Sequence, residues 1–570
     1  MRLKIIRLII IFLFGMIVCE LFYVQIIRGR YYFRLSKNNR IRVVPLEGGR
    51  GRIFDRNNVV IADNSVSYSV MVTPQEIQNQ EKVFDFLSAV LKEDKALLIR
   101  RYQQKKFTPF APVTIAEDIS KEKAIVIEEN KYLYPSIFVH EGFKRSYPLG
   151  EYAAHVVGYV DKINRSRMEK LKRYGYTPQS IIGYSGVEEY YDAYLKGGNG
   201  GQQVEVNSRG KQVRLLSLKE PTRGQDLTLT IDSRVQKMTH ELLDGKQGVI
   251  VMMDMDNGEI LALSSSPSFD PNYFLDSSKG RQLSKLFNDP AAPLLNRVTR
   301  SSLPPGSVFK APLAVAGLDT KKINEGTTFD CTGYVELGGI KFGCTHIHGP
   351  QNLLESIAHS CNVYYYRLGK MLGPDVIHRY AAIFGFGKLT HIDLPHERAG
   401  NLPSRRQRML SGKRWYEGDT LNFAIGQGDL LATPMQLTKM MAIIAREGWE
   451  VQPHVIKTIG GKEVEKYTFE QKVPIHPAVF QTVKKGLRAT VKDYTGTAHV
   501  LDIPGLHVAG KTGTAQSSGN KEHHAWFAGY ILSEKKNVAF CVLLEHGGSS
   551  QNACLIARQL LLSLQREQII

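Results

Sequence analysis

The sequence predicts an α+β fold: a single N-terminal transmembrane helix, a mixed α/β pedestal domain, and a C-terminal domain whose antiparallel five-stranded sheet carries helices on both faces. Three observations predict it: an apolar run at residues 8–27, two strand-like runs within residues 248–266, and three more strand-like runs and a helix after residue 500. The chain has 570 residues, enough for about two to four domains. Its apolar fraction of 43% and charged fraction of 23% are ordinary for globular proteins, so most of the chain can bury cores.

The first predicted element is a membrane anchor at residues 8–27, preceded by a short basic tail at residues 1–7 that we expect in the cytoplasm. Twenty helical residues rise about 30 Å, the thickness of one bilayer core. No small-residue cleavage site follows the run, which favours an uncleaved anchor over a removed signal peptide. Six basic residues between 28 and 42 would keep the rest of the chain in the cytoplasm, but long domains translocate largely regardless of charge.

The predicted pedestal covers residues 28–240. Glycines and an Asn-Asn turn separate short β-branched runs in residues 43–64, a pattern that predicts strands and turns. We expect charged helical stretches from there to about residue 175. Residues 183–197 predict one short helix that Gly197 closes.

The predicted C-terminal domain covers residues 241–570. Asn257-Gly258 between two apolar runs is a strong signal for a hairpin. Pro304-Pro305-Gly306 then halts the chain before an apolar helix. Three strand-like runs and a last helix at about residues 551–566 complete the domain; the runs are GLHVAGKTGTAQ, HAWFAGYIL and NVAFCVLLEHG. Two strands, then helices, then three strands and a helix predict helices on an antiparallel sheet.

The net charge is strongly positive. A formal charge of +19 and a pI of about 9.4 suit a polyanionic partner, which can be nucleic acid, anionic lipid or an acidic polymer. The chain has no ribonucleoprotein aromatic motif and no long block of Lys and Arg, so we expect no nucleic-acid partner.

Three short motifs carry the predicted chemistry. In the first, Ser307-Val308-Phe309-Lys310 opens the apolar helix, where residues three apart share a face, so the Lys310 amine can reach the Ser307 hydroxyl. The helix N-terminus favours negative charge that develops there. Four other Ser-x-x-Lys matches stand in polar contexts without such a helix: Ser120, Ser208, Ser518 and Ser533.

The second motif is Ser360-Cys361-Asn362, in which Ser360 can pass on a proton and Asn362 can hydrogen-bond a substrate amide. The third motif, residues 511–514, ends an apolar run with Lys511-Thr512-Gly513-Thr514. There Gly513 leaves room for a substrate backbone, the two threonines can bind a carboxylate, and Lys511 adds positive charge. Residues 494–497, Tyr-Thr-Gly-Thr, repeat the threonines without the lysine and are interpreted as a decoy.

Each motif is weak alone, but all three in this order and context are a specific signal of penicillin-binding proteins and class A β-lactamases. The chain resembles the class B penicillin-binding proteins of the elongation type over nearly its whole length. GRGRIFDRNNVVIADN (49–64) and GYSGVEEYYDAYLKG (183–197) carry the resemblance outside the three motifs, and β-lactamases lack these segments. Departures are few: Asn58 stands where Gly is usual, and Asn362 where the elongation type often has Asp.

The resemblance implies a peptidoglycan D,D-transpeptidase that cross-links stem peptides during cell elongation, forms an acyl-enzyme on Ser307 and binds β-lactams. It implies a catalytic set of Ser307, Lys310, Ser360 and Lys511, and a substrate-binding set of Asn362, Thr512, Gly513 and Thr514. The chemistry needs no cofactor. The expected partners are stem peptides, the inner membrane and a membrane glycan polymerase of the SEDS type, since the chain has no glycosyltransferase motif. We therefore expect a single-pass inner-membrane protein whose catalytic domain lies outside the cytoplasm.

Four further residues have metal-ligand spacing. Cys331, Cys344, His348 and Cys361 follow the pattern C-x12-C-x3-H-x12-C. Such a set can hold a structural zinc ion in a tetrahedral site, and His346 is an alternative ligand. A Cys331–Cys344 disulfide, which an oxidising compartment permits, and unrelated buried cysteines are the competing interpretations.

The same motifs are compatible with two rival functions. A β-lactam sensor or a β-lactamase shares the three motifs, but it does not need residues 30–240, and no second carboxylate base is evident for deacylation. A non-catalytic scaffold that activates a glycan polymerase does not need an intact Ser307, Lys310 and Lys511.

Overall fold

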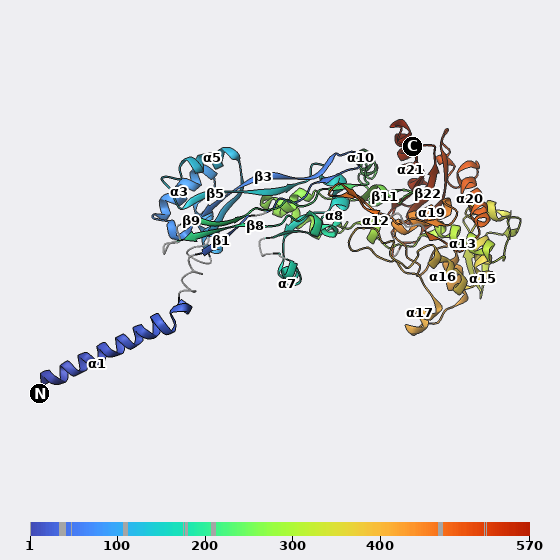
Figure 1. Cartoon of the computed structure of the whole chain (residues 1–570). Helices are drawn as coiled ribbons and strands as arrows, with labels where there is room; N and C mark the ends of the chain where they lie inside the picture. Colours follow the sequence, from blue (N-terminus) through green and yellow to red (C-terminus); the bar gives the residue numbers. More distant parts are fainter. Residues whose placement is uncertain are drawn as a thin grey trace. The chain divides into compact units, whose positions relative to one another are not determined.

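The computed structural model describes residues 2–32, 41–46, 48–106, 112–174, 176, 180–206, 212–465, 471–517, 519 and 521–570. It divides into two compact units. The smaller unit contains Met1–Gly51, Asn64–Lys144 and Lys196–Gly224, and the larger unit contains Arg52–Asp63, Arg145–Leu195 and Gln225–Ile570. Figure 1 labels the elements of both.

The smaller unit begins with the predicted apolar helix. Helix α1 (Arg2–Phe22) continues through a π-helical turn, η1 (Tyr23–Ile27), and no side chain from Leu3 to Ile27 is buried. In the described part of the chain, Leu3–Ile27 is the one helix that is long and apolar enough to cross a membrane.

The rest of the smaller unit has a three-stranded antiparallel sheet in the order β1-β8-β9, and a second group of strands with helices packed on it. The bounds are β1 (Ile41–Leu46), β8 (Gly200–Val206), β9 (Gln212–Lys219), β4 (Val113–Ile119), β5 (Ile137–Ser146), α3 (Gln80–Leu91), α4 (Lys95–Lys105) and α5 (Lys121–Glu129). Strands β4 and β5 both pair with β3 (Val60–Val72). The predicted charged helical stretches are therefore present as α3, α4 and α5, and the sequence prediction missed strands β4 and β5, which lie between and after them.

The larger unit is built on a five-stranded sheet in the order β12-β11-β23-β22-β21, and every pair in it is antiparallel. The bounds are β11 (Gly248–Asp254), β12 (Ile260–Ser266), β21 (His507–Ala515), β22 (His524–Leu532) and β23 (Val538–Leu544). The turn at Asn257-Gly258 joins β11 to β12, and Gly258 has the positive φ of 84° that such a turn needs. The predicted five-stranded antiparallel sheet is confirmed.

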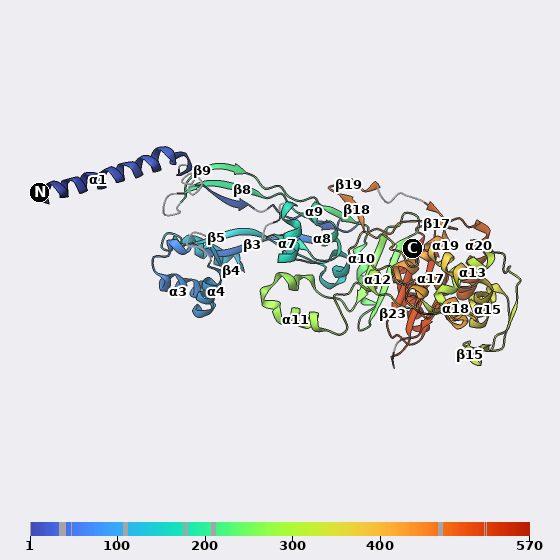
Figure 2. The same ribbon diagram turned by 90° about the horizontal axis from the view of Figure 1, so that it is seen from below.

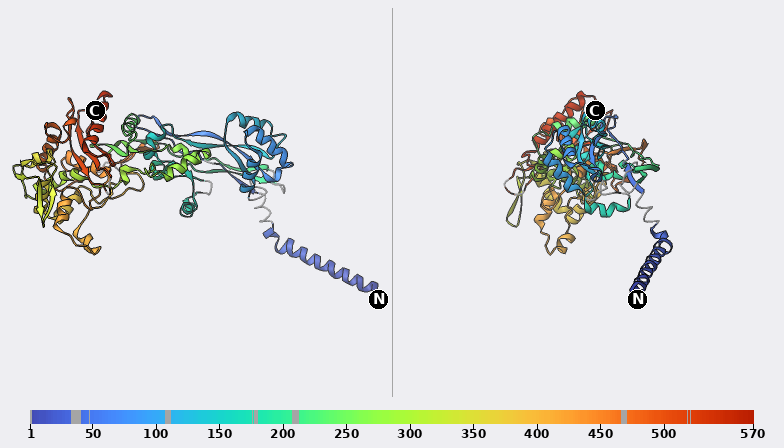
Figure 3. Two further views of the ribbon diagram at one scale, coloured as in Figure 1. Left: turned by 180° about the vertical axis from the view of Figure 1, so that it is seen from behind. Right: turned by 90° about the vertical axis from the view of Figure 1, so that its left-hand side faces the viewer.

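Helices cover both faces of this sheet. Along β11, Val249 and Val251 belong to one hydrophobic core, and Ile250 and Met252 belong to another. The first core includes α13 (Lys310–Asp319), α19 (Pro434–Ala445) and most of α20 (Pro477–Lys492); the second includes α10 (Ser233–Glu241) and α21 (Ser550–Arg566). Figure 3 shows α21, in dark red, against the red strands of the sheet. Since successive side chains of a strand point to opposite faces, both faces are buried.

Smaller elements of the larger unit surround the motifs. Their bounds are α14 (Leu353–Ala358), α15 (Asn362–Leu372), α18 (Glu417–Ala424), β13 (Phe329–Cys331), β14 (Tyr334–Leu337), β15 (Ile340–Gly343) and β16 (Gly349–Gln351). The helix predicted at residues 183–197 is two short helices, α8 (Gly186–Tyr190) and α9 (Asp192–Leu195), because the backbone leaves the helical conformation at Tyr191. The larger unit also contains residues 52–63, 145–195 and 225–240. The predicted division of the chain into two domains at residue 240 stays a prediction.

Candidate active site

Ser307 lies at the start of the apolar helix, as the sequence predicts. Gly306–Phe309 form a 3-10 turn, η7, that leads directly into α13. Gly306 has a φ of 54°, and its N–H donates to the carbonyl oxygen of Gly426 at 3.0 Å. A Cβ on Gly306 would lie 2.9 Å from the carbonyl oxygen of Thr514, so a glycine is needed to hold the turn against β21. The Ser307 side chain is half-buried at the surface of this turn.

Lys310 is fully buried, and its amine is held by the second motif. Nζ donates to the carbonyl oxygen of Ser360 at 2.6 Å, to Oδ1 of Asn362 at 2.6 Å and to Oγ of Ser360 at 3.3 Å. Burial lowers the pKa of Lys310 to about 8, although the neighbouring cysteines oppose the shift. The lysine can therefore lose its proton close to neutral pH, as a general base must.

Ser360 occupies a strained position between α14 and α15. Its φ of 56° lies in the left-handed region, which costs a residue with a Cβ about 1–2 kcal/mol. The N–H of Cys361 donates to the carbonyl oxygen of Ser356 at 3.0 Å, which holds the tight connection between the two helices. This conformation turns the Ser360 carbonyl towards Lys310, so the strain lies where the two motifs meet.

Lys511 is also fully buried, in the edge strand β21. Burial and then the charge of Lys310 lower its pKa well below the usual value. Thr514 is exposed, but Thr512 is buried, and its hydroxyl donates to Oγ1 of Thr497 at 2.9 Å. The role of Thr512 in binding substrate stays a prediction, since its hydroxyl already has a protein partner.

Gly513 serves the packing of the site. A Cβ on it would lie 2.8 Å from the carbonyl oxygen of Pro305, 3.0 Å from Cγ2 of Val308 and 3.1 Å from Cβ of Trp526. The space beside Gly513 is therefore filled by the turn that carries Ser307. Gly513 was expected to leave room for a substrate backbone, and the contact with Pro305 could not be predicted because it joins residues far apart in the chain.

Residues 494–497, interpreted from the sequence as a decoy, contact the third motif and the two residues that precede the second motif. Besides the bond between Thr497 and Thr512, the N–H of Thr497 donates to the carbonyl oxygen of Ala358 at 3.1 Å. Thr495 Oγ1 lies 3.0 Å from Nε2 of His359. The repeated Thr-Gly-Thr was the only signal in the sequence that could have drawn attention to this segment.

The four other Ser-x-x-Lys matches are not part of the candidate site as the structure describes it. Ser120 accepts a hydrogen bond from the N–H of Lys123 and caps α5, and Ser533 donates to the carbonyl oxygen of Lys536. Ser208 and Ser518 lie outside the described residues.

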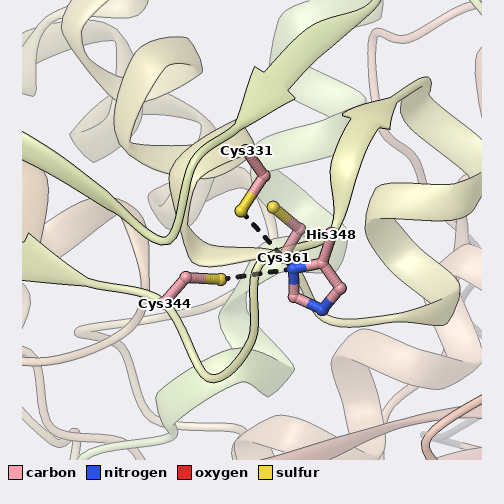
Figure 4. A group of neighbouring side chains, drawn as sticks. All are labelled: Cys331, Cys344, His348 and Cys361. Carbon is pink, nitrogen blue, oxygen red and sulfur yellow. Dashed lines mark hydrogen bonds between the residues drawn. The ribbon is translucent and has the colours of Figure 1, made fainter.

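The three cysteines and the histidine with metal-ligand spacing form one cluster (Figure 4). The sulfurs of Cys331, Cys344 and Cys361 and a ring nitrogen of His348 all lie within 4.8 Å of one another. Nδ1 of His348 is 3.5 Å from the sulfurs of both Cys331 and Cys344. Zinc–sulfur bonds of about 2.3 Å place tetrahedral ligands slightly less than 4 Å apart, so the four groups have nearly the spacing of a zinc site.

The cluster distinguishes among the three interpretations of the cysteines. The structure holds all three cysteines as free thiols and so gives no support to the competing Cys331–Cys344 disulfide. The alternative ligand His346 stacks on His348 and accepts from the Cys331 thiol through its carbonyl oxygen at 3.6 Å. The contact between Cys344 and Cys361 lowers the pKa of Cys344 and raises that of Cys361.

The cluster is joined to the second motif. Cys361 is the middle residue of that motif, and the N–H of Asn362 donates to the sulfur of Cys344 at 3.1 Å. The Asn362 side chain also donates to the carbonyl oxygen of Gly343 at 3.1 Å. Any group that holds the four side chains together would therefore hold Asn362, a partner of Lys310, in place.

Comparison with known proteins gives matches over almost the whole chain. Residues 248–562 match the family described as penicillin binding protein transpeptidase domain, and residues 45–229 match penicillin-binding protein dimerisation domain. The peptidoglycan D,D-transpeptidase MrdA of Escherichia coli strain K12 is 32% identical, and the match covers 97% of this chain and 92% of that protein.

Two solved structures are similar over most of their length. One is the complex between penicillin-binding protein PBP2 and MreC from Helicobacter pylori, with a TM-score of 0.84, 27% identity, and coverage of 93% of this chain and 99% of that chain. The other is a peptidoglycan synthase complex, described as coordinating polymerization and crosslinking. Its TM-score is 0.74 with 30% identity, and the match covers 98% of this chain and 97% of that chain.

Proposed function

This chain belongs to the class B penicillin-binding proteins and is a peptidoglycan D,D-transpeptidase, and we propose that Ser307 is its nucleophile and Lys310 the base that activates it. One observation carries the proposal. The Lys310 amine is buried one helical turn after Ser307, and it lies 2.6 Å from both the Ser360 carbonyl oxygen and Oδ1 of Asn362. A buried amine with a pKa of about 8 can accept the proton of a serine hydroxyl.

In the proposed reaction, Oγ of Ser307 attacks the carbonyl carbon of the penultimate D-alanine of a stem peptide, and its proton passes to Lys310. The backbone N–H groups of Ser307 and Thr514 donate to the oxyanion; losing one such donor typically costs about 10²–10³ in rate. The amide bond then breaks, the terminal D-alanine leaves with the proton on its amine, and an ester remains on Ser307. An amine of a second stem peptide attacks this ester, forms the cross-link and returns the proton to Ser307.

The remaining residues of the site have positioning roles in this proposal. Ser360 lies beside the Lys310 amine, where its hydroxyl can relay the proton towards the leaving amine. Lys511 and the exposed Thr514 face the terminal carboxylate of the stem peptide, and Asn362 both holds Lys310 and binds a substrate amide.

Labelling with fluorescent penicillin tests the nucleophile. The wild-type chain should give one covalent adduct, mapped by mass spectrometry to Ser307, and Ser307→Ala should give none. Labelling that survives in Ser307→Ala, or that maps to another serine, overturns the assignment. The rate of loss of the adduct separates the functions: release over hours fits a transpeptidase, and release within milliseconds fits a β-lactamase.

We further propose that residues 8–27 cross the inner membrane once and that residues 28–240 form a pedestal for a catalytic domain at 241–570 outside the cytoplasm. The support is the apolar helix at Leu3–Ile27 and a substrate polymer that lies outside the membrane. A reporter fused after Ile570 should be active only outside the cytoplasm. Activity in the cytoplasm alone would show that the basic residues at 28–42 set the orientation.

A membrane glycan polymerase of the SEDS type, in the cell-elongation machinery, is the proposed partner. The support is the similarity to a structure described as a peptidoglycan synthase complex and the absence of a glycosyltransferase motif in this chain. We expect residues 8–27 and 45–65 to contact the polymerase. Photo-crosslinking from these segments should capture it, and complete cross-linking of wall precursors without any separate polymerase would make the partner unnecessary.

We propose zinc as a structural ion held by Cys331, Cys344, His348 and Cys361. The support is the spacing of the four groups and the soft thiolate donors that zinc prefers. The ion would take no part in the acyl transfer. It would fix the loop between β13 and α15, and so Asn362, relative to Lys310.

A further inference from the structure

A basic segment lies next to the candidate active site and is not used by the proposed mechanism. The segment, residues 404–416, is called here the basic loop, and it contains the short helix α17 (Arg405–Leu410). The side chains of Arg406, Lys413 and Arg414 are exposed, and no ion pair in the described part of the chain engages them. Arg405 reaches Asp375 at 3.6 Å, but both side chains are more than half exposed, so this pair contributes little.

The basic loop is held in one conformation by Arg408. Its guanidinium pairs with Asp419 at 2.5 Å and with Asp429 at 2.7 Å, and it lies 5.1 Å from the centre of the Trp415 ring. The indole N–H of Trp415 donates to Oγ1 of Thr420 at 2.8 Å. The backbone that carries the exposed cations is therefore already ordered, which reduces the conformational entropy lost when a ligand binds.

Aromatic packing joins this support to the nucleophile turn. Trp415 packs edge-on against Phe423, with 6.2 Å between the ring centroids, and Phe423 stacks on Phe309 at 5.5 Å. Phe309 belongs to the turn that carries Ser307. The basic loop and the nucleophile are thus parts of one packed structure.

Hydrogen bonds place the loop at the rim of the site. Asp429, a partner of Arg408, comes two residues after Gln427, whose side-chain amide donates to the carbonyl oxygen of Thr514 at 3.4 Å. The carbonyl oxygen of Gly426 accepts from the N–H of Gly306. A substrate strand that leaves the candidate site near Thr514 would therefore pass close to the basic loop.

The exposed side chains of the loop are apolar as well as cationic. Met409 is 70% exposed, Leu410 is 77% exposed and Tyr416 is 67% exposed. An aromatic ring offers its face to a sugar ring, and arginines bind carboxylates through paired hydrogen bonds. The combination suits a polymer with sugar rings, small apolar groups and repeated carboxylates.

We propose that the basic loop binds the glycan strand and acidic stem peptides of the wall polymer next to the stem peptide that reacts at Ser307. The inference rests on the proposed function, because a transpeptidase must hold a polymer in which each stem peptide ends in a carboxylate. Repetition of the stems makes that polymer a polyanion, in keeping with the net charge of +19.

The test measures co-sedimentation of the full-length chain with isolated, insoluble peptidoglycan. The variant Arg406→Ala/Lys413→Ala/Arg414→Ala should bind about 3–30 times more weakly than wild type at low salt, and its binding should depend less on salt. Arg281→Ala/Lys285→Ala/Lys322→Ala is the matched control, because these cations are also exposed and belong to the same unit. Figure 2 draws α11 (Gly280–Asn288), which carries Arg281 and Lys285, apart from α17. The control should bind like wild type.

Acylation by penicillin separates this inference from the proposed function. The proposed acylation chemistry uses none of the exposed side chains of Arg406, Lys413 and Arg414, so the loop variant should be acylated by penicillin at the wild-type rate. If penicillin acylates neither the wild type nor the variants, the proposed function fails. The co-sedimentation of wild type, loop variant and control with peptidoglycan still tests whether the basic loop binds the polymer. Equal binding of the loop variant and the control overturns the inference. So does a loop variant that keeps peptidoglycan binding and loses binding to vesicles containing phosphatidylglycerol, which would assign the loop to a lipid surface.

Discussion

The Lys310 amine lies 2.6 Å from Oδ1 of Asn362, so the third residue of one motif holds the last residue of another. Because of this hydrogen bond, the pKa of Lys310 depends on the charge of the side chain at position 362. The acylation rate of wild type should rise with pH and level off above the Lys310 pKa of about 8, because the neutral amine is the base.

Asn362→Asp should move this profile to higher pH. A carboxylate at hydrogen-bond distance stabilises the ammonium form, which raises the pKa of Lys310 by about 1–3 units and slows acylation near neutral pH. Stopped-flow measurement of penicillin acylation from pH 6 to 10 gives the midpoint. Asn552→Asp, on the exposed start of α21, adds the same charge elsewhere and should leave the midpoint unchanged. An unchanged midpoint in Asn362→Asp would mean that Lys310 is not the titrating base.

Thr497→Val should slow acylation without abolishing it. The substitution removes the acceptor of the Thr512 hydroxyl, a bond worth about 0.5–1.5 kcal/mol, or about 2–10 times in rate if it orients Lys511 and Thr514. Thr497→Ser keeps the acceptor and should restore most of the rate. If the valine and serine variants acylate equally fast, the hydroxyl pair has no role in the reaction.

Gly513→Ala should reduce both stability and acylation. The new methyl group would lie 2.8 Å from the Pro305 carbonyl oxygen, so β21 and the Ser307 turn must separate, at a cost of about 1–3 kcal/mol. Thermal unfolding and penicillin labelling on the same sample measure the two effects. Gly280→Ala is the control, because its methyl group would meet no atom within 4 Å. Wild-type labelling in Gly513→Ala would show that the contact does not position the nucleophile.

Chain purified without a polyhistidine tag should contain about one zinc ion, and Cys361→Ser should contain none. Metal analysis and free-thiol titration measure this directly. Loss of the ion should lower the melting temperature and slow acylation, because the loop that carries Ser360 and Asn362 loosens. The matched control is Cys541→Ser, a buried cysteine of β23 outside the cluster, which should keep its zinc. Metal-free protein in which Cys331 and Cys344 are oxidised together would favour the disulfide instead.

The sequence by itself predicted the elements whose signals lie close together in the chain. Asn257-Gly258 between two apolar runs predicted the β11–β12 hairpin, and residues 8–27 predicted the apolar helix. The positions of Ser307 and Lys310 one helical turn apart follow from the same local rules of turn and helix formation. The family resemblance, confirmed by the comparisons, followed from such short segments.

Only the tertiary structure decided which distant residues meet. In the folded chain, the segment at 494–497 contacts Thr512, although this segment has only the Thr-Gly-Thr of the third motif and not its lysine. In the folded chain, Pro305 occupies the space beside Gly513, and His348, not His346, lies with the three cysteines of the cluster. The physical reason is range. Turns and helices depend on neighbours within a few residues, whereas the packing of β21 on the Ser307 turn joins residues about 200 positions apart, whose distance depends on how the whole core closes.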